Sequence, residues 1–112
     1  MATIRQNKIS RLLQKELGEV FQKKSGALFP GGLVTVTNVE ASPDLSIAKV
    51  YLTILGNFKP ADAIELLMQK RGEIRNELAH RVRRQLRIVP DLRFYIDESY
   101  DAMRRIETLL SK

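Results

Sequence analysis

The stretch KRGEIRNELAHRVRRQLRIVPDLR, residues 70–93, decides the fold prediction for this chain. Apolar residues recur in it at every fourth position, at Ile74, Leu78, Val82 and Leu86. This spacing predicts a helix with one buried side. Eight basic and three acidic residues leave the stretch with five of the six net positive charges of the chain. One helix can therefore anchor in a core and present a cationic surface.

The cationic side of this predicted helix carries His80, Arg83, Arg84 and Arg87. Seven of the eight cations in the stretch are Arg, whose planar guanidinium forks onto phosphates and stacks on bases. We interpret the Arg side as a nucleic-acid contact in preference to a merely solvated helix face. His80 has no neighbouring residue that would make it a ligand or a catalytic base, so a surface position that can approach phosphate is expected.

The limits of this helix follow from Gly72 and Pro90. Pro90 biases the preceding residue towards extended geometry, so the helix is expected to end near Arg87. Periodicity alone allows one continuous helix over residues 60–87, and Gly72 is its only breaking signal. We expect a kink at Gly72, which would make Gly72→Ala destabilising. Arg75 falls on the apolar side, where its head group would snorkel or pair with a carboxylate.

Composition limits the class of protein. The 112 residues fit one domain, 1–112, and Cys is absent, which excludes disulfides and Cys-based zinc sites. No segment has the roughly 18 apolar residues that span a bilayer, and no signal peptide is visible, so a soluble cytoplasmic protein is expected. The pI near 9.9 favours a polyanionic partner. Metal clusters, phosphate loops and nucleophile–base pairs are not apparent, so we expect no enzyme, no cofactor, no metal and no small-molecule substrate.

The rest of the chain alternates helical and extended patterns. An amphipathic helix is predicted from about Thr3 to Lys24, with a stop at Ser25-Gly26. Residues 33–40 and 45–55 read as an antiparallel hairpin around the turn Ser42-Pro43-Asp44. A helix begins at Pro60, a third strand covers residues 92–97, and a last helix begins at about Ser99.

Two segments resemble the ribosome-binding factor A family. They are VEASPDLSIAKVYLTILG, residues 39–56, and RGEIRNELAHRVRRQLRIVPDLRFYIDES, residues 71–99. The resemblance implies an α+β, type II KH-like domain, α-β-β-α-α-β, with its helices on one face of a three-stranded sheet and an added C-terminal helix. It also implies a bacterial assembly factor that binds the immature small (30S) ribosomal subunit and its 16S rRNA. Members of the family support late maturation and rRNA end processing, and they matter most in the cold.

The G-x-x-G loop with which KH domains grip single strands does not occur in this sequence. The family has Ala-x-Gly at the corresponding kink, and this chain has Lys70-Arg71-Gly72. The resemblance therefore predicts a helix–kink–helix at KRG. It also predicts weak, nearly sequence-independent binding of short isolated single strands.

The predicted RNA contacts come from the basic stretch and from one side of the first helix. They are Arg83, Arg84, Arg87, Arg81, His80, Lys70, Arg71, Gly72, Arg5, Lys8, Arg11 and Lys15. A monomer is expected, without membrane contact.

Two alternatives stay open. A KH-like protein–protein module without direct RNA contact would pair through a sheet edge. A stacking platform formed by Tyr51 and Tyr95, with Lys49 and Arg93, would resemble that of RNA-recognition motifs. The platform is less favoured because the element order of those motifs, β-α-β-β-α-β, differs from the order predicted here.

Overall fold

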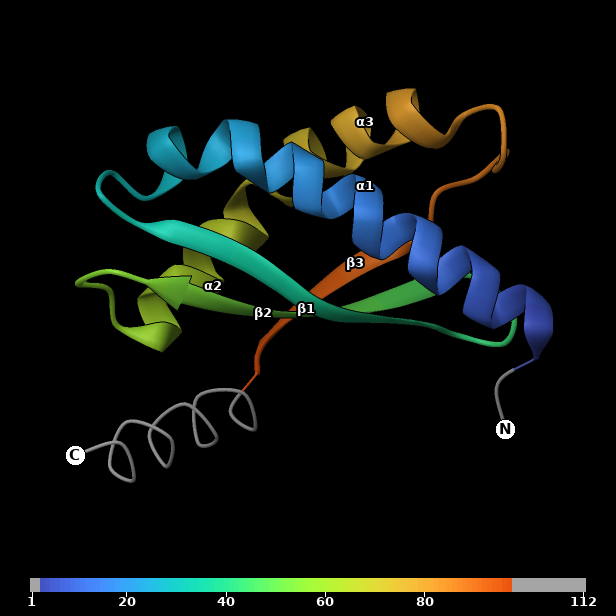
Figure 1. The fold of residues 1–112 in the computed structure, drawn as a ribbon, viewed down its shortest axis with the longest axis horizontal. Coiled ribbons are helices and arrows are strands. Elements are labelled where there is room, and N and C mark those ends of the chain that lie inside the picture. The colour runs from blue at the N-terminus through green and yellow to red at the C-terminus, as the bar shows by residue number, and fades with distance from the viewer. Residues whose placement is uncertain (1–2, 98–112) are drawn as a thin grey trace, which may run out of the picture.

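The computed structural model describes residues 3–97. Its six elements are α1 (Ile4–Leu28), β1 (Leu33–Ala41), β2 (Ile47–Leu55), α2 (Pro60–Gln69), α3 (Arg71–Val82) and β3 (Asp91–Ile96) (Figure 1). The order α-β-β-α-α-β predicted for a type II KH-like domain is therefore confirmed. The helix predicted from Ser99 lies outside the described residues.

Helix α1 begins with a capping box and runs further than predicted. The Thr3 hydroxyl accepts from the Gln6 amide at 3.1 Å, and the Gln6 side chain accepts from the Thr3 amide at 2.9 Å. The predicted stop at Ser25-Gly26 is wrong, because the helix continues to Leu28. Ser25 is buried, and its hydroxyl donates to the Phe21 carbonyl one turn earlier. A Ser satisfied in this way stays inside a helix instead of ending it.

The sheet is mixed, with the strand order β1-β2-β3. Strands β1 and β2 form the predicted antiparallel hairpin, and β3 pairs parallel to β2. The register shifts between Val36 and Asn38, so Thr37 is an inserted bulge residue. The bulge was not predicted. It shifts the alternation of side chains along β1 by one position, so Val34 before the bulge and Val39 after it are both buried.

The hairpin turn is held by one carboxylate. Asp44 Oδ1 accepts from the Ser46 hydroxyl at 2.7 Å, the Ser42 hydroxyl at 2.8 Å and the Ser46 amide at 3.1 Å. These hydrogen bonds, above all that from the Ser46 side chain, lower the pKa of Asp44 to about 2. The following residue, Leu45, takes a left-handed conformation with φ 61°.

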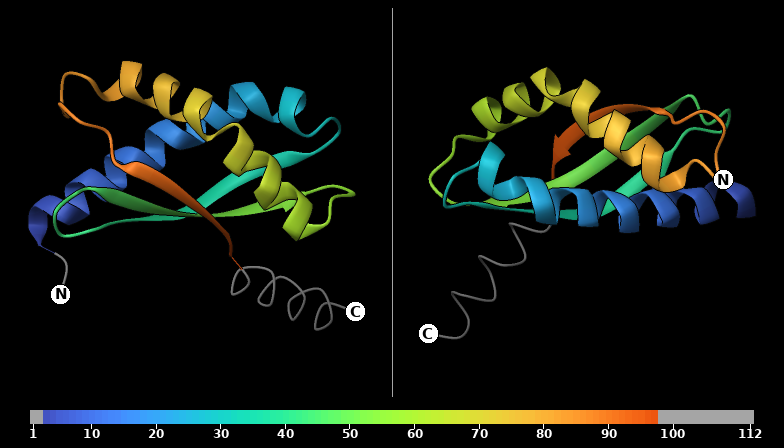
Figure 2. Two further views of the ribbon diagram at one scale, coloured as in Figure 1. Left: turned by 180° about the vertical axis from the view of Figure 1, so that it is seen from behind. Right: turned by 90° about the horizontal axis from the view of Figure 1, so that it is seen from above.

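One hydrophobic core joins the helices to a single face of the sheet (Figure 2). The alternation along β2 predicts that Ala48, Val50, Leu52 and Ile54 face inward; the first three are fully buried and Ile54 is partly buried. The helices contribute buried residues at the predicted positions, and these are Ile9, Leu13, Leu17, Val20, Phe21, Leu67, Ile74, Leu78 and Val82. The predicted arrangement of helices on one face of a three-stranded sheet is confirmed.

The predicted helix break exists, and it lies at Lys70 (φ −94°, ψ 5°), two residues before Gly72. Gly72 has no positive φ, and a Cβ added to it would meet nothing within 4 Å. The expectation that the kink lies at Gly72 itself is therefore wrong, and no atom lies close enough to oppose the methyl group of Gly72→Ala. We attribute the break to packing, because Leu67 of α2 and Leu78 of α3 are both fully buried and a straight helix could not bring both stripes to one twisted sheet.

Helix α3 ends at Val82, five residues earlier than predicted. The Gln85 and Leu86 amides donate to the Val82 carbonyl at 2.9 and 2.8 Å, which closes a turn after the helix. Burial of Val89, only 6% exposed, then directs the chain back towards β3. Arg75 supports this return, because its Nη2 donates to the Val89 carbonyl at 2.6 Å. The predicted structural role of Arg75 is confirmed, with a carbonyl as the partner in place of a carboxylate, but its predicted place on the apolar side is wrong, because the residue is exposed.

Candidate nucleic-acid interface

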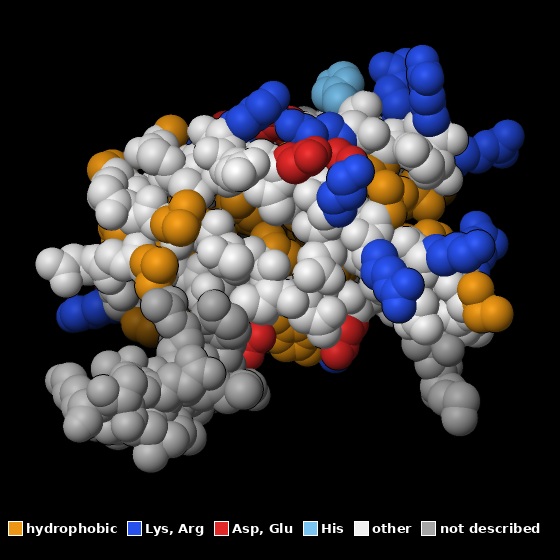
Figure 3. Space-filling view, viewed as in Figure 1, with side chains coloured by type: hydrophobic (Ala, Val, Ile, Leu, Met, Phe, Trp, Pro, Cys, Tyr) orange, Lys and Arg blue, Asp and Glu red, His pale blue; other side chains and the backbone are white. Residues whose placement is uncertain are grey.

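Cationic side chains from two distant parts of the sequence gather at one end of the molecule. Figure 3 shows Lys and Arg side chains over the N-terminal half of α1 and beyond the end of α3. We call this surface the basic end and define it by seven exposed residues, which are Arg5, Lys8, Arg11, Lys15, Arg83, Arg84 and Arg87. Among the described residues, none of the seven forms an ion pair.

Ion pairs between α1 and α3 show how the two helices are aligned, and hence which of their cations lie at the same end of the molecule. Lys24 Nζ lies 3.3 Å from Glu77 Oε2. Further along, Arg81 Nη1 lies 2.8 Å from Glu19 Oε2 and 3.2 Å from Glu16 Oε2. Because residue numbers fall on α1 as they rise on α3, the helices run antiparallel. The end of α3 is thereby directed towards the N-terminal half of α1.

The three Arg residues expected on the helix itself lie beyond it. Arg83 and Arg84 occupy the turn after α3, and Arg87 lies in the bend that follows. The prediction that they share a helix side is wrong, because α3 ends at Val82. Their exposure is as predicted.

Arg81 differs from its neighbours. Its side chain is only 22% exposed, and it holds two carboxylates of α1. The charge of Arg81 is therefore paired within the protein, where these ion pairs link α1 to α3. Local sequence patterns carry no signal for the link, because Glu16 and Glu19 precede Arg81 by more than sixty positions. His80 is exposed on α3 beside this link.

The residues at the helix break form a separate group. Lys70 and Gly72 lie at the start of α3, and the basic end lies past its other terminus, about 18 Å away for twelve residues. Lys70 Nζ is 3.9 Å from Glu73 Oε1, and Arg71 Nε is 3.8 Å from Asp91 Oδ1. The structure therefore does not bring these predicted contacts together with Arg83 and Arg84.

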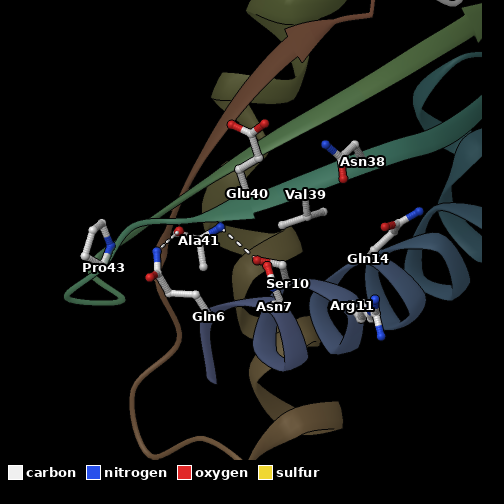
Figure 4. Close-up of a pocket in the computed structure, with 10 residues that line it drawn as sticks. All are labelled: Gln6, Asn7, Ser10, Arg11, Gln14, Asn38, Val39, Glu40, Ala41 and Pro43. Atoms are coloured by element: carbon white, nitrogen blue, oxygen red, sulfur yellow. Dashed lines mark hydrogen bonds between the residues drawn. The ribbon is translucent and has the colours of Figure 1, made fainter. Parts of the chain in front are cut away.

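A groove of about 650 Å³ runs between α1 and the outer edge of β1 (Figure 4). Polar side chains of α1 cross it to the strand. The Gln6 and Gln14 amides donate to the carbonyls of Ala41 and Thr37 at 3.2 and 3.3 Å, and the Ala41 amide donates to Ser10 Oγ at 3.0 Å. Arg11 lines the same groove and so joins it to the basic end.

Residues 3–97 also bear on two other kinds of site, a metal centre and a membrane-spanning helix. This range contains no group of three or more His, Asp or Glu residues that could hold a metal ion. Nor does it contain a helix long and apolar enough to cross a membrane. The feature that the described residues do form is the basic end, a cationic surface on an α+β fold.

Comparison with known proteins agrees with this scaffold. The family model described as ribosome-binding factor A matches residues 5–110. This chain belongs to the ribosome-binding factor A family. A ribosome-binding factor A from Cytophaga hutchinsonii is 37% identical over 112 residues, which cover all of this chain and 84% of the relative.

Solved structures of the family share the fold. The crystal structure of ribosome-binding factor A from Thermus thermophilus superposes with a TM-score of 0.66 at 26% identity, over 81% of this chain and 94% of the other. A homology model of the Thermus thermophilus factor, fitted into a cryo-EM map of its complex with the 30S subunit, gives 0.62 at 30% identity, over 78% and 89% of the two chains.

Proposed function

We propose that this protein is a non-enzymatic assembly factor that binds the immature small ribosomal subunit, with the basic end placed on 16S rRNA. The observation that carries the proposal is the convergence of seven exposed cations, from α1 and from the turn after α3, on one end of the fold. Family membership and the 30S complex of the Thermus relative support the choice of partner.

The mechanism we propose is positional. Arg83, Arg84 and Arg87 and the α1 cations neutralise phosphates and release their condensed counterions. Phosphate contacts fix the orientation of a protein on RNA without reading its sequence. The rigid domain then holds a local rRNA conformation during late maturation, and we extend the proposal to rRNA end processing in the cytoplasm and to growth in the cold, on the strength of the family resemblance.

A protein–protein module that acts through the edge of β1 is less well supported. The side chains of Gln6, Ser10 and Gln14 occupy outward-facing backbone groups of this strand. A partner strand would have to displace α1 before it could pair there.

The test compares two double variants that remove the same charge. Arg83→Ala with Arg84→Ala alters the basic end, and Lys23→Ala with Lys59→Ala removes two exposed cations at other sites on the surface. Binding to purified small subunits is measured across a salt series. Each lost phosphate contact lowers the log–log slope by roughly 0.7 to 0.9, so the first variant should flatten it by about 1.5 units and the second should leave it unchanged.

Equal slopes for the two variants, with both proteins folded, would contradict the proposal. The accumulation of 16S rRNA precursors in cells that carry only the Arg83/Arg84 variant tests the processing step separately. Normal precursor levels together with weakened subunit binding would restrict the proposal to binding.

A further inference from the structure

Two tyrosines stack on the face of the sheet opposite the core. Tyr51 of β2 and Tyr95 of β3 are register partners, with ring centroids 5.5 Å apart and planes inclined by 28°. Tyr51 alternates with the buried Val50 and Leu52, so it points away from the helices. Tyr95 remains 42% exposed.

The stacking determines which ring face is available to a ligand. One face of Tyr95 is turned towards Tyr51. Its opposite face is turned towards the edge of the sheet, because β3 is the last strand in the order β1-β2-β3. Tyr51 lies between Tyr95 and its other register partner, Asn38. A planar aromatic group placed on the outer face of Tyr95 would therefore extend an existing stack.

The charged residues that precede the tyrosine pair along β2 and β3 differ from those that follow it. Lys49 and Arg93, themselves register partners, precede the tyrosines by two residues and share their face of the sheet. Arg93 Nε is 3.4 Å from Asp91 Oδ2, and that carboxylate is shared with Arg71, while Glu40 is the β1 partner of Lys49. Lys49 and Arg93 thus share this side with two carboxylates, and Asp91 is also paired with Arg71 of α3. On the other side, Asp97 Oδ2 accepts from the Thr37 hydroxyl at 2.6 Å.

The pair is connected to the basic end along the chain. The loop that carries Arg83, Arg84 and Arg87 leads directly into β3 at Asp91. Tyr95 lies four residues further along the strand, about 13 Å away. The tyrosine pair therefore lies on the strand that follows the loop of the basic end, on the face of the sheet away from the helices.

We propose that the outer face of Tyr95 binds one unpaired RNA base, with the adjoining phosphate beside Lys49 and Arg93. The inference rests on the proposed function and adds a single-stranded contact to it. Stacking on an aromatic ring accepts every base, which agrees with the absence of a G-x-x-G loop. Tyr51 serves as a positioning residue that supports Tyr95 from behind.

The test uses a short oligouridylate, whose bases stack weakly on one another, containing one fluorescent base, 2-aminopurine, and a blunt RNA duplex of equal length without unpaired bases. The variants are Tyr95→Leu, which removes the ring, and Tyr95→Phe, which keeps it. We expect Tyr95→Leu to bind the single strand roughly 5- to 100-fold more weakly than the wild type, and Tyr95→Phe to bind within about twofold of it. Duplex binding and the salt slope should be unchanged in both, because neither variant removes a charge.

Quenching of 2-aminopurine by the wild-type protein tests the stack without any variant. Absence of quenching at saturation overturns the inference, as does equal single-strand affinity of folded Tyr95→Leu and wild type. A change in oligomeric state with unchanged RNA affinity would make the tyrosine pair a protein contact and also overturn it. If the wild type binds duplex and small subunits without quenching, only this inference fails; if it binds no RNA, the proposed function fails with it.

Discussion

The Ala41 amide donates a hydrogen bond to the Ser10 hydroxyl at 3.0 Å, across 31 positions of sequence. The Ala41 carbonyl accepts from Gln6 of the same helix at 3.2 Å. Both outward-facing backbone groups of one residue at a sheet edge are thus satisfied by side chains of α1. Edge strands are open to pairing with other chains unless they are covered, and this contact covers β1 at its end.

Removal of this cover should cost stability and expose the edge. Ser10→Ala leaves the Ala41 amide without its protein partner, and we expect a loss of about 1 kcal/mol in the free energy of unfolding. Adding Gln14→Ala, which frees the Thr37 carbonyl, should promote self-association at high concentration. Denaturant unfolding and sedimentation measure the two effects, with Asn7→Ala, an exposed α1 residue of the same groove, as the control. A double variant as stable and as monomeric as this control would contradict the capping role.

Arg81 should contribute to stability more than to RNA binding. Arg81→Ala removes the ion pairs between α1 and the end of α3 and leaves Glu16, whose side chain is 15% exposed, without a cation. We expect a loss of about 1 kcal/mol, discounted for partial exposure. The salt slope of subunit binding should change less than in Arg83→Ala, because the charge of Arg81 is already paired within the protein. Equal slope changes in the two variants would identify Arg81 as a phosphate contact.

Gly72→Ala should stabilise the protein. Gly72 is the second residue of α3, and a Cβ there meets no atom within 4 Å, so the substitution gains helix propensity of up to about 1 kcal/mol without a clash. Thermal unfolding measures the gain, with Gly26→Ala in α1, equally free of contacts, as a second helix-interior comparison. A lowered melting temperature would restore a conformational role for Gly72.

Gly32→Ala should have the opposite effect. A Cβ at Gly32 would lie 2.6 Å from Phe58 Cε2 and 2.9 Å from the Leu55 carbonyl oxygen. The phenyl ring is itself held edge-on against Phe29, at a centroid distance of 5.1 Å, and backbone oxygen moves only with its strand. We expect a loss of about 1 to 3 kcal/mol from overpacking, measured by denaturant unfolding. A neutral effect would mean that Phe58 moves aside freely.

The Asp44 turn predicts an acid-dependent loss of stability. The pKa of Asp44 is lowered from 3.8 to about 2, so the carboxylate stabilises the folded state fully above its unfolded pKa and loses this effect as the pH falls towards 2. Asp44→Asn removes the titration. The stability difference between wild type and Asp44→Asn should therefore shrink between about pH 5 and about pH 2. A difference that stays constant over this range would show that the Ser42 and Ser46 contacts do not depend on the charge.

Local patterns were sufficient for the element order and for the core. The four-residue spacing of Ile74, Leu78 and Val82 and the alternation of Ala48, Val50 and Leu52 specify the buried sides of α3 and β2, because side-chain direction repeats with the period of each element. Short-range signals, such as Pro60 at a helix start, are confirmed as well. Arg83, Arg84 and Arg87 are exposed as predicted, but in the turn and bend after α3 and not on a side of the helix.

Element ends and the assembly of the site depended on tertiary contacts. Ser25 remains in α1 because its hydroxyl is satisfied there, and α3 ends at Val82 because burial of Val89 redirects the chain. The basic end forms because α1 and α3 pack antiparallel in one core, where Leu17 and Val82 are fully buried, and the pairing of Arg81 with Glu16 and Glu19 is consistent with this alignment. Periodicity describes a residue relative to its own helix or strand. It carries no information on which other element lies opposite, and that choice is made by burial and charge pairing across the whole chain.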